Sequence, residues 1–331
     1  SLHCGEAMQD HLLATALEQT VHRYGEDAGA LSQAARHHLS SPGKRTRSKL
    51  LFAATPNTPN IKALVHAAAA VELIHEASIV HDDIQDQTER RRGMPTVWRQ
   101  YGANAALLLG DHLVAAAFRA VAEAEQIDPI EGSLILALSQ SVSRAASGQH
   151  LQLTNATQGE FKAFYDEVAI NKTGALIALP LEFAALFNDW ENQDTSSARR
   201  CGEHLGLAYQ ILDDLKPYAA PGNLAADEDM QHRVVTAPVA ACSTLFPKVD
   251  PFHALVNHAS LRAKAIRQCQ HWLDTALASA RYEAAFLAAH SALVVENFIT
   301  GQLTTKPIRE TQSMPTYSPW RKQTAVRVEA V

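Results

Sequence analysis

Aspartates at the ends of two apolar segments are the residues of this chain best placed to do chemistry. Asp82 and Asp86 are four residues apart, so on a helix they share one face with Cβ atoms about 5–6 Å apart, whereas Asp83 projects to the side. Two carboxylates at this spacing repel each other unless a hard cation lies between them, and Mg²⁺ is the oxygen-seeking ion that also binds substrate phosphates. His75 lies on the same face two turns earlier. The segment therefore predicts a magnesium-bound phosphate site.

Basic residues near these aspartates are suited to binding the phosphate itself. Arg90, Arg91 and Arg92, followed by Gly93, place three cations within a turn or two of the acids and form a natural anion clamp. An anionic substrate also needs counter-charges from elsewhere in the chain. The candidates are Lys44, Arg45, Arg47, Lys172 with the neighbouring Thr173, and Arg233.

A second apolar segment also ends in a pair of acids. Asp213 and Asp214 close it, and Gln210 precedes Asp213 by about one turn, placed to hydrogen-bond what a metal holds. Two such helices facing each other across a bundle could hold several Mg²⁺ ions around one diphosphate and turn it into a leaving group. Singly, an acidic cluster is more often a solvated helix end, and an arginine run is more often surface. Their combination predicts a metal-bridged diphosphate site.

The elements that position these residues are predicted to be helices. Alanine and leucine dominate the 331 residues, β-branched alternation is scarce, and Gly and Pro gather in separators at 56–60, 188–197 and 217–223. Residues 63–80 and 175–187 are apolar nearly all round, so they should lie centrally in a bundle. The pattern predicts an all-α fold.

The length allows one large domain or two small ones. We predict a single large helical bundle with a central active-site cavity over residues 1–303. Residues 304–331 contain three prolines and many polar residues, and we predict a C-terminal tail with little regular structure there.

Composition narrows the partners and the compartment. The formal charge of −6 provides no general attraction to nucleic acid or to an anionic membrane. The most apolar stretch, 103–122, is interrupted by Asp111, His112 and Arg119, so no membrane span is predicted, and no secretory signal is visible. Scattered cysteines without a paired spacing favour free thiols and a cytoplasmic location. They are Cys4, Cys201, Cys242 and Cys269.

On these motifs the chain resembles the trans-prenyltransferase family of polyprenyl and geranylgeranyl diphosphate synthases, over about residues 40 to 300. The first aspartate-rich motif of the family, two Asp, two variable residues and Asp, stands at 82–86, and its Arg-Arg-Gly stands at 91–93. The other matches are Gly43-Lys44-Arg45-Thr46-Arg47, His75 at the isopentenyl-binding position, Gly148-Gln149, Lys172-Thr173, and Gln210, Asp213 and Asp214 in the second aspartate-rich motif.

Two departures from the family pattern lie in the second motif region. The family has a third Asp where this chain has Pro217, and a Gly-Lys where it has Arg233-Val234. The loss of one carboxylate would weaken a metal site, or mark a specialised or partly disabled member. Arg233 is the candidate to supply the missing cation.

The resemblance implies an Mg²⁺-dependent enzyme that condenses isopentenyl diphosphate head-to-tail with an allylic diphosphate. The allylic diphosphate would lie between the two aspartate motifs with Mg²⁺, Lys172 and Arg91, with three ions expected when substrate is bound. The metal ligands would be Asp82, Asp86 and Asp213, and Asp83 would complete the catalytic set. Isopentenyl diphosphate would lie on Lys44, Arg47, His75 and Arg92.

The implied chemistry needs no acid or base beyond the substrates. Ionisation of the allylic diphosphate comes first, the double bond of isopentenyl diphosphate attacks the cation, and the released diphosphate takes the proton. Thr173 and Gln210 would shield the cation. Family members pair through central helices, so the resemblance also implies a homodimer.

Product length is expected to depend on the helix that leads into the first motif. Ala77 and Ser78, five and four positions before Asp82, are small where family members that stop at fifteen carbons commonly carry an aromatic ring. The next candidate floor is Ile74, one turn or about 5.4 Å deeper, which is roughly one isoprene unit. We therefore predict a product of twenty carbons, geranylgeranyl diphosphate, or somewhat longer. The alternative is that Ala77 packs against a neighbouring helix and a residue from elsewhere closes the tunnel.

Other functions remain open on sequence grounds. His81-Asp82 is the pair that helical metal-dependent phosphohydrolases use, but that function leaves the second aspartate pair unexplained. Pro217 and Val234 suggest a catalytically weakened or regulatory subunit of a prenyl synthase. A terpene cyclase would leave the isopentenyl-binding residues without a purpose.

Overall fold

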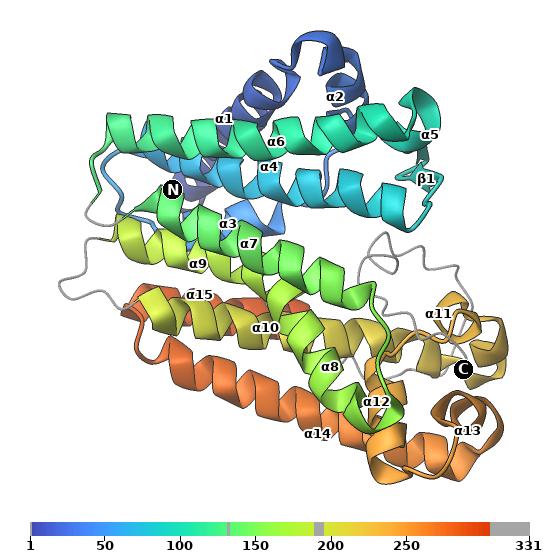
Figure 1. Cartoon of the computed structure of the whole chain (residues 1–331). Coiled ribbons are helices and arrows are strands. Elements are labelled where there is room, and N and C mark those ends of the chain that lie inside the picture. Colours follow the sequence, from blue (N-terminus) through green and yellow to red (C-terminus); the bar gives the residue numbers. More distant parts are fainter. Residues whose placement is uncertain (1, 131–132, 189–194, 305–331) are drawn as a thin grey trace. The chain divides into compact units, whose positions relative to one another are not determined.

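The computed structural model describes residues 2–130, 133–188 and 195–304 (Figure 1). Most of these residues are helical, and the two-stranded β1–β2 hairpin is the sheet among them. The chain divides into two compact units: Ser1–Gln140 with Leu179–Thr195 as unit 1, and Ser141–Ala178 with Ser196–Val331 as unit 2. The C-terminal tail predicted for 304–331 lies outside the described residues except for Thr304.

Unit 1 contains the first aspartate motif and the basic residues around it. Its elements are α1 (Leu2–Glu26), η1 (Gly29–Leu31), α2 (Ser32–Leu39), α3 (Thr46–Ala54), α4 (Ile61–Gln85), β1 (Arg90–Arg91), β2 (Met94–Pro95), α5 (Val97–Tyr101) and α6 (Ala103–Ile127). Two helices contribute to both units, α7 (Leu134–Gln152) and α9 (Ala175–Phe187).

Unit 2 contains the second aspartate motif. Its helices are η2 (Gln158–Glu160), α8 (Phe161–Val168), the π-helical turn η3 (Ala169–Gly174), α10 (Thr195–Leu215), η4 (Lys216–Ala219), η5 (Pro221–Ala226), α11 (Glu228–Gln231), α12 (Ala237–Leu245), α13 (Pro251–Asn257), α14 (Ala259–Ala284) and α15 (Ala289–Gln302). The separator predicted at 217–223 lies in the short 3₁₀ helices η4 and η5, and Pro217 is the second residue of η4.

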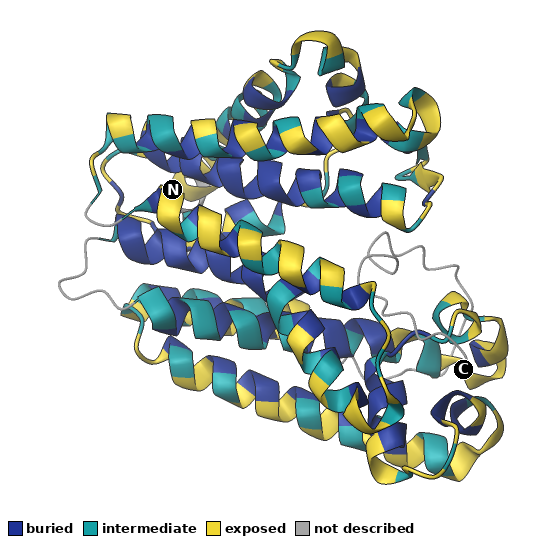
Figure 2. Ribbon diagram, in the orientation of Figure 1, coloured by how far each residue is buried: buried dark blue, intermediate teal, exposed yellow. Residues whose placement is uncertain are grey.

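Helix α4 is the buried core of unit 1. It begins where the side chain of Asn60 accepts a hydrogen bond from the amide of Ala63 at 3.2 Å, and it packs along α6 and α1. Its alanine run, 67–70, is fully buried and lets α6 approach closely. Figure 2 shows α4 dark along most of its length, as the apolar pattern of residues 63–80 predicts. The second predicted core helix, α9, is buried throughout 175–187.

Small residues set the crossing of α10 with the η3–α9 segment in unit 2. An added Cβ at Gly202 would lie 2.2 Å from the Cα atom of Ala178, and one at Gly206 would lie 2.5 Å from the Cα atom of Gly174. Gly202 and Gly206 are four residues apart on α10, and Gly174 and Ala178 are four residues apart on the facing segment. Each pair therefore forms a stripe of small residues on one helix face. The two backbones are in contact here, and this contact fixes the position of α10 along its axis relative to η3.

Three helical segments are long and apolar enough to cross a membrane by length and composition alone. They are Ile61–Gln85, Ala103–Ile127 and the run Gln158–Phe187. Most of the apolar window of the first and third is buried, at 94% and 83%, whereas 44% of the α6 window is. The polar interruptions in α6 do not by themselves exclude a span, and the absence of one stays a prediction.

We expect Gly206→Ala to lower the free energy of unfolding by about 2 kcal/mol, because the new methyl group meets backbone atoms that cannot move aside. The gain in helix propensity of up to about 1 kcal/mol would offset part of the cost. Gly159→Ala is the matched control, since a Cβ there has open space. Denaturant unfolding of both variants measures the difference, and equal stabilities would contradict the close crossing.

Candidate active site

The first aspartate motif closes α4, and its three acids differ in surroundings. Asp82 and Asp83 are buried and Asp86 is half-buried at the end of the helix, where its amide donates to the carbonyl of Asp82 at 2.8 Å. The spacing of Asp82 and Asp86 therefore remains helical, which places both carboxylates on one face as predicted. Asp83 is bound by the guanidinium of Arg91, with Nε donating to Oδ2 at 3.0 Å and Nη2 donating to Oδ1. Asp83 orients Arg91 in this way.

A tight hairpin turn positions Arg92. Strands β1 and β2 pair with Arg91 opposite Met94, which leaves Arg92 and Gly93 as a two-residue turn in which both have positive φ, 51° and 78°. The turn directs the Arg92 guanidinium to the segment before α3. There it donates to the carbonyl of Ser41, and an added Cβ on Gly43 would lie 2.9 Å from its Nη2 atom.

Arg45 is an anchor rather than a substrate-facing cation. It has a left-handed backbone, φ 56°, and its buried guanidinium pairs with Glu18 at 2.6 Å, Glu76 at 3.2 Å and Glu72 at 3.5 Å. Its inclusion among the cations available to substrate is therefore wrong in this structure, because three carboxylates surround it. Ion pairs to α4 hold this strained residue where α3 begins.

Glu72 and Glu76 are the residues of this region that the sequence analysis did not single out. Glu72 also accepts a hydrogen bond from the amide of Ser48 at 2.9 Å. Glu76 accepts a hydrogen bond from Nε2 of His38 at 2.6 Å. Both are almost fully buried. The sequence signal that could have found them is two glutamates one turn apart inside an apolar helix. Because glutamate is rarely buried unless it is paired, this pattern predicts that both have basic partners.

Arg47, His75 and Arg92, three of the predicted isopentenyl-binding residues, lie close together in unit 1. Burial lowers the pKa of the His75 imidazole well below its usual value, and the charges of Arg47 and Arg92 lower it further. Burial also lowers the pKa of Arg92, and Arg91 and Arg45 act in the same direction. Lys44 is exposed next to this group. The like charges of Arg47 and Arg92 repel each other, so a bound anion would stabilise this group of residues.

The residues predicted to limit product length lie on α4. Ala77 and Ile74 are buried in unit 1, and Ser78 is half-buried with its hydroxyl donating to the carbonyl of His75 at 2.6 Å. Burial of Ala77 fits both a tunnel wall and a helix contact, so the tunnel stays a prediction.

Lys172 and Thr173 belong to the π-helical turn η3 of unit 2, and both are buried. A π-helical turn holds one residue more than an α-helical turn and is common at functional sites. The ammonium of Lys172 donates to Gln152 Oε1 at 2.8 Å.

The two aspartates of the second motif have different environments. Asp214 is buried, and it accepts from Tyr165 Oη at 2.7 Å, from Gln210 Nε2 at 2.8 Å and from a backbone amide of α12 at 2.9 Å. Burial raises its pKa to about 7 despite these donors. Asp213 instead pairs with the half-exposed Lys216 at 2.7 Å. Asp214 therefore ties α10 to α8 and α12, and Asp213 is the member suited to a ligand.

The side-chain nitrogen of Gln210 donates to Asp214 Oδ1 at 2.8 Å. Its Oε1 atom is buried and has no hydrogen-bond partner among the described residues, so this acceptor is the part of Gln210 that a ligand could use.

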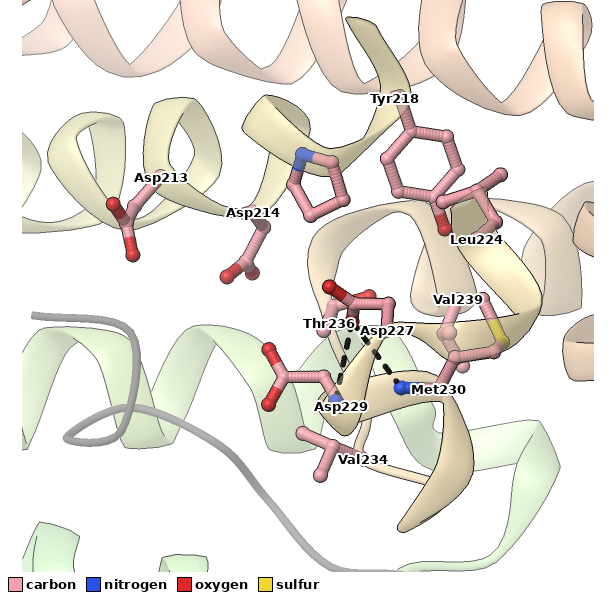
Figure 3. Close-up of a pocket in the computed structure, with 11 residues that line it drawn as sticks. Asp213, Asp214, Tyr218, Leu224, Asp227, Asp229, Met230, Val234, Thr236 and Val239 are labelled. Carbon is pink, nitrogen blue, oxygen red and sulfur yellow. Dashed lines mark hydrogen bonds between the residues drawn. The ribbon is translucent and has the colours of Figure 1, made fainter. Parts of the chain in front are cut away.

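A small cleft in unit 2 lies beside the second motif (Figure 3). Its acidic residues are Asp213, Asp214, Asp227 and Asp229. Pro217, at the position of the missing third aspartate, also lines it. Asp227 caps α11, because it accepts from the amides of Asp229 at 3.1 Å and Met230 at 3.4 Å. The sequence analysis did not single out these two acids of α11, whose signal is the run Asp227-Glu228-Asp229.

Arg233 has another partner in this structure. It has positive φ, 51°, pairs with Asp250 at 3.4 Å, and its guanidinium lies 4.4 Å from the centre of the Phe252 ring. It is not among the residues that line the cleft of Figure 3. Its role as the missing cation stays a prediction that requires the release of Asp250.

The acids fit a magnesium ion that is completed by substrate. Among the described residues, no group of three or more His, Cys, Asp or Glu side chains forms a ready-made metal site. Mg²⁺ is commonly held by one or two carboxylates plus waters and substrate phosphates, which is what Asp82 with Asp86, and Asp213, can offer.

Comparisons with known proteins agree with the motifs. Residues 28–271 match the protein family described as Polyprenyl synthetase. A short chain isoprenyl diphosphate synthase of Methanocaldococcus jannaschii is 30% identical over 212 residues, which is 64% of this chain and 64% of that relative. The match thus spans less than two thirds of the relative.

Two solved structures show the same fold. A decaprenyl diphosphate synthase from Rhodobacter capsulatus aligns with a TM-score of 0.73 at 22% identity, covering 92% of this chain and 100% of the other. A polyprenyl synthase from Caulobacter crescentus, complexed with calcium and isoprenyl diphosphate, aligns with a TM-score of 0.70 at 22% identity, covering 90% and 97%. The predicted all-helical fold of the isoprenoid synthase type is confirmed.

We expect Glu76→Gln to lower the free energy of unfolding at pH 7 by about 3 kcal/mol, because it leaves Arg45 and His38 with one carboxylate fewer. Burial opposes ionisation of Glu76, but the charge and hydrogen bond of His38 outweigh it and hold the carboxyl pKa well below its usual range. The stabilisation is therefore present above about pH 4.3, the usual glutamate pKa, and is lost as the pH falls toward the folded pKa.

Chemical denaturation from pH 7 to pH 3 measures this effect, and the gap between wild type and Glu76→Gln should narrow with acid. The exposed Glu89 provides the control, since Glu89→Gln should stay within about 0.5 kcal/mol of wild type throughout. A gap that is independent of pH would contradict the assignment.

Proposed function

The chain belongs to the polyprenyl synthetase family, and we propose that it is a prenyl diphosphate synthase that condenses isopentenyl diphosphate head-to-tail with an allylic diphosphate. The observation that carries the proposal is that the guanidinium groups of Arg47 and Arg92 lie beside the His75 imidazole, in the same unit as the aspartate pair at the end of α4. Such a unit offers both an anion site and a metal site.

Each reacting group has proposed residues in this chain. Isopentenyl diphosphate would bind Lys44, Arg47, His75 and Arg92, among which the three cations suit the negative charge of a diphosphate that does not ionise. Arg91 and Lys172 would contact the allylic diphosphate, whose carbon–oxygen bond breaks as the new carbon–carbon bond forms. The released diphosphate accepts the proton lost from the isopentenyl unit. The Thr173 hydroxyl and the Gln210 Oε1 atom would face the allylic cation.

Magnesium is the proposed metal, with Asp82, Asp86 and Asp213 as ligands and three ions when substrate is bound. Bound Mg²⁺ would stabilise the charge that develops on the departing diphosphate. The chain would hold this charge in fixed geometry, since Asp83 orients Arg91 and Asp214 anchors the end of α10.

Further proposals concern assembly and location. Leu107 and Leu108 of α6 are about half exposed, at 51% and 54%, and they support the proposal of a homodimer. Cys201, Cys242 and Cys269 are free and buried, which supports a cytoplasmic location.

The alternatives receive less support. A phosphohydrolase would use His81 as a metal ligand, but its Nε2 atom lies 3.0 Å from the carbonyl of Leu107, and the ring fills the space beside Gly110 of α6. A regulatory subunit remains the second candidate because Pro217 lines the second-motif cleft where an acid is expected.

The purified chain alone, with Mg²⁺ and both substrates, should form product. We expect Asp82→Asn and Asp86→Asn to lower turnover by about 10²–10³-fold, because each removes a charge that stabilises the leaving group. Folding should survive these isosteric changes. The control is Asp111→Asn, whose side chain is 63% exposed. No product from the wild-type chain would favour the regulatory subunit, and near-normal turnover of both variants would refute the role of the first motif.

The product should have twenty carbons or somewhat more. We expect Ala77→Phe to shift the product to a shorter chain, because the ring would occupy the path one turn below Asp82. Chromatography of labelled products measures the length, and thermal unfolding of the variant separates a blocked tunnel from a disrupted helix contact. A folded variant with an unchanged product distribution would place the floor elsewhere.

A further inference from the structure

The π-helical turn η3 and the last turns of α7 touch each other through their backbones. An added Cβ on Gly148 would lie 2.6 Å from the amide nitrogen of Lys172 and 2.9 Å from the carbonyl carbon of Asn171. These are backbone atoms and cannot turn aside as a flexible side chain would. Only glycine fits at this contact, which fixes where the backbone of Lys172 lies along the length of α7.

One turn beyond Gly148, the same face of α7 presents Gln152. It is the final residue of the helix and is 1% exposed. Its Oε1 atom accepts a hydrogen bond from the Lys172 ammonium at 2.8 Å, and Lys172 itself is 8% exposed. A buried ammonium is costly unless it is hydrogen-bonded, and Gln152 provides such a hydrogen bond.

We propose that Gln152 is a positioning residue, which holds the Lys172 ammonium in the direction required by the diphosphate of the allylic substrate. The inference rests on the proposed function. Gly148 sets the distance between the two backbones, and Gln152 sets the direction of the side chain. The sequence motifs include Lys172 but not Gln152.

The acceptor is an amide, and its chemistry suits this task. A side-chain amide offers a directed oxygen without a full negative charge, so it orients the ammonium without forming an ion pair. A glutamate in its place would bind the ammonium by a charge-assisted hydrogen bond. An incoming diphosphate would then have to compete with a carboxylate for Lys172.

The test compares Gln152→Glu and Gln152→Met in the full chain. The first adds a competing charge at the same length, and the second removes the acceptor at similar volume. Gln268→Glu on α14 is the control for an added charge in the same unit. Calorimetry with an allylic S-thiolodiphosphate and Mg²⁺ measures binding to a substrate analogue that does not ionise readily, and steady-state kinetics measure the KM for each substrate.

We expect Gln152→Glu to weaken analogue binding and to raise the KM for the allylic substrate about tenfold, while the KM for isopentenyl diphosphate stays within about twofold of wild type. Gln152→Met should show a smaller effect on the same substrate. Gln268→Glu should match wild type. Thermal unfolding near that of wild type would show that the fold is intact.

Two results would overturn the inference. One is wild-type binding of the analogue by both Gln152 variants. The other is an equal loss for both substrates together with a lower melting temperature, which indicates a structural role alone. A wild-type chain that makes no product contradicts the proposed function, whereas analogue binding that is lost in Gln152→Glu supports the positioning role even then.

Discussion

Polar and charged groups on buried helices have to be paired, and this constraint separates the residues of each motif into anchors and ligands. In the basic motif, Arg45 is enclosed by carboxylates, whereas Lys44 is exposed. In the first aspartate motif, Asp83 is bound by Arg91. A buried group without its partner would cost several kcal/mol, so the anchors are as necessary as the residues that meet substrate.

The second aspartate motif follows the same division. Asp214 receives donors from α8, α10 and α12, and it therefore joins three helices of unit 2. Its neighbour Asp213 has an exposed lysine as its partner, whose place an incoming cation could take. Both adjacent aspartates are buried, and they differ in their partners, because one accepts from three donors and the other pairs with an exposed lysine. Fixed anchors hold the polar groups in place before substrate arrives.

The sequence located the motifs and the core helices because their signals are local. Two predicted core helices, at 63–80 and 175–187, are buried as their apolar pattern requires. The division into anchors and ligands could not be read this way, since it depends on partners far along the chain. Tyr165 lies 49 residues from Asp214, and Glu72 lies 27 residues from Arg45.

The second-motif region shows a different limit of sequence reasoning. The Pro- and Gly-rich stretch at 217–223 indicates a loop, but it forms short 3₁₀ turns. Proline is compatible with the first residues of such a turn, because the amide that it lacks would have no partner within the turn. The ion pair of Arg233 with Asp250 is likewise set by the fold, since charge and spacing alone cannot distinguish a protein partner from a substrate.

The π-helical turn at 169–174 makes this part of the chain sensitive to a change in its length. It holds one residue more than an α-helical turn, so it is an inserted residue stored inside a continuous helix. Removing one residue before Lys172 would restore regular α-helix and shift the side chains of the wide turn by one position relative to α7. Gln152 and Gly148 would then face a different side chain, while the apolar core of α9 kept its register. Point substitutions are therefore far easier to accommodate here than a single deletion.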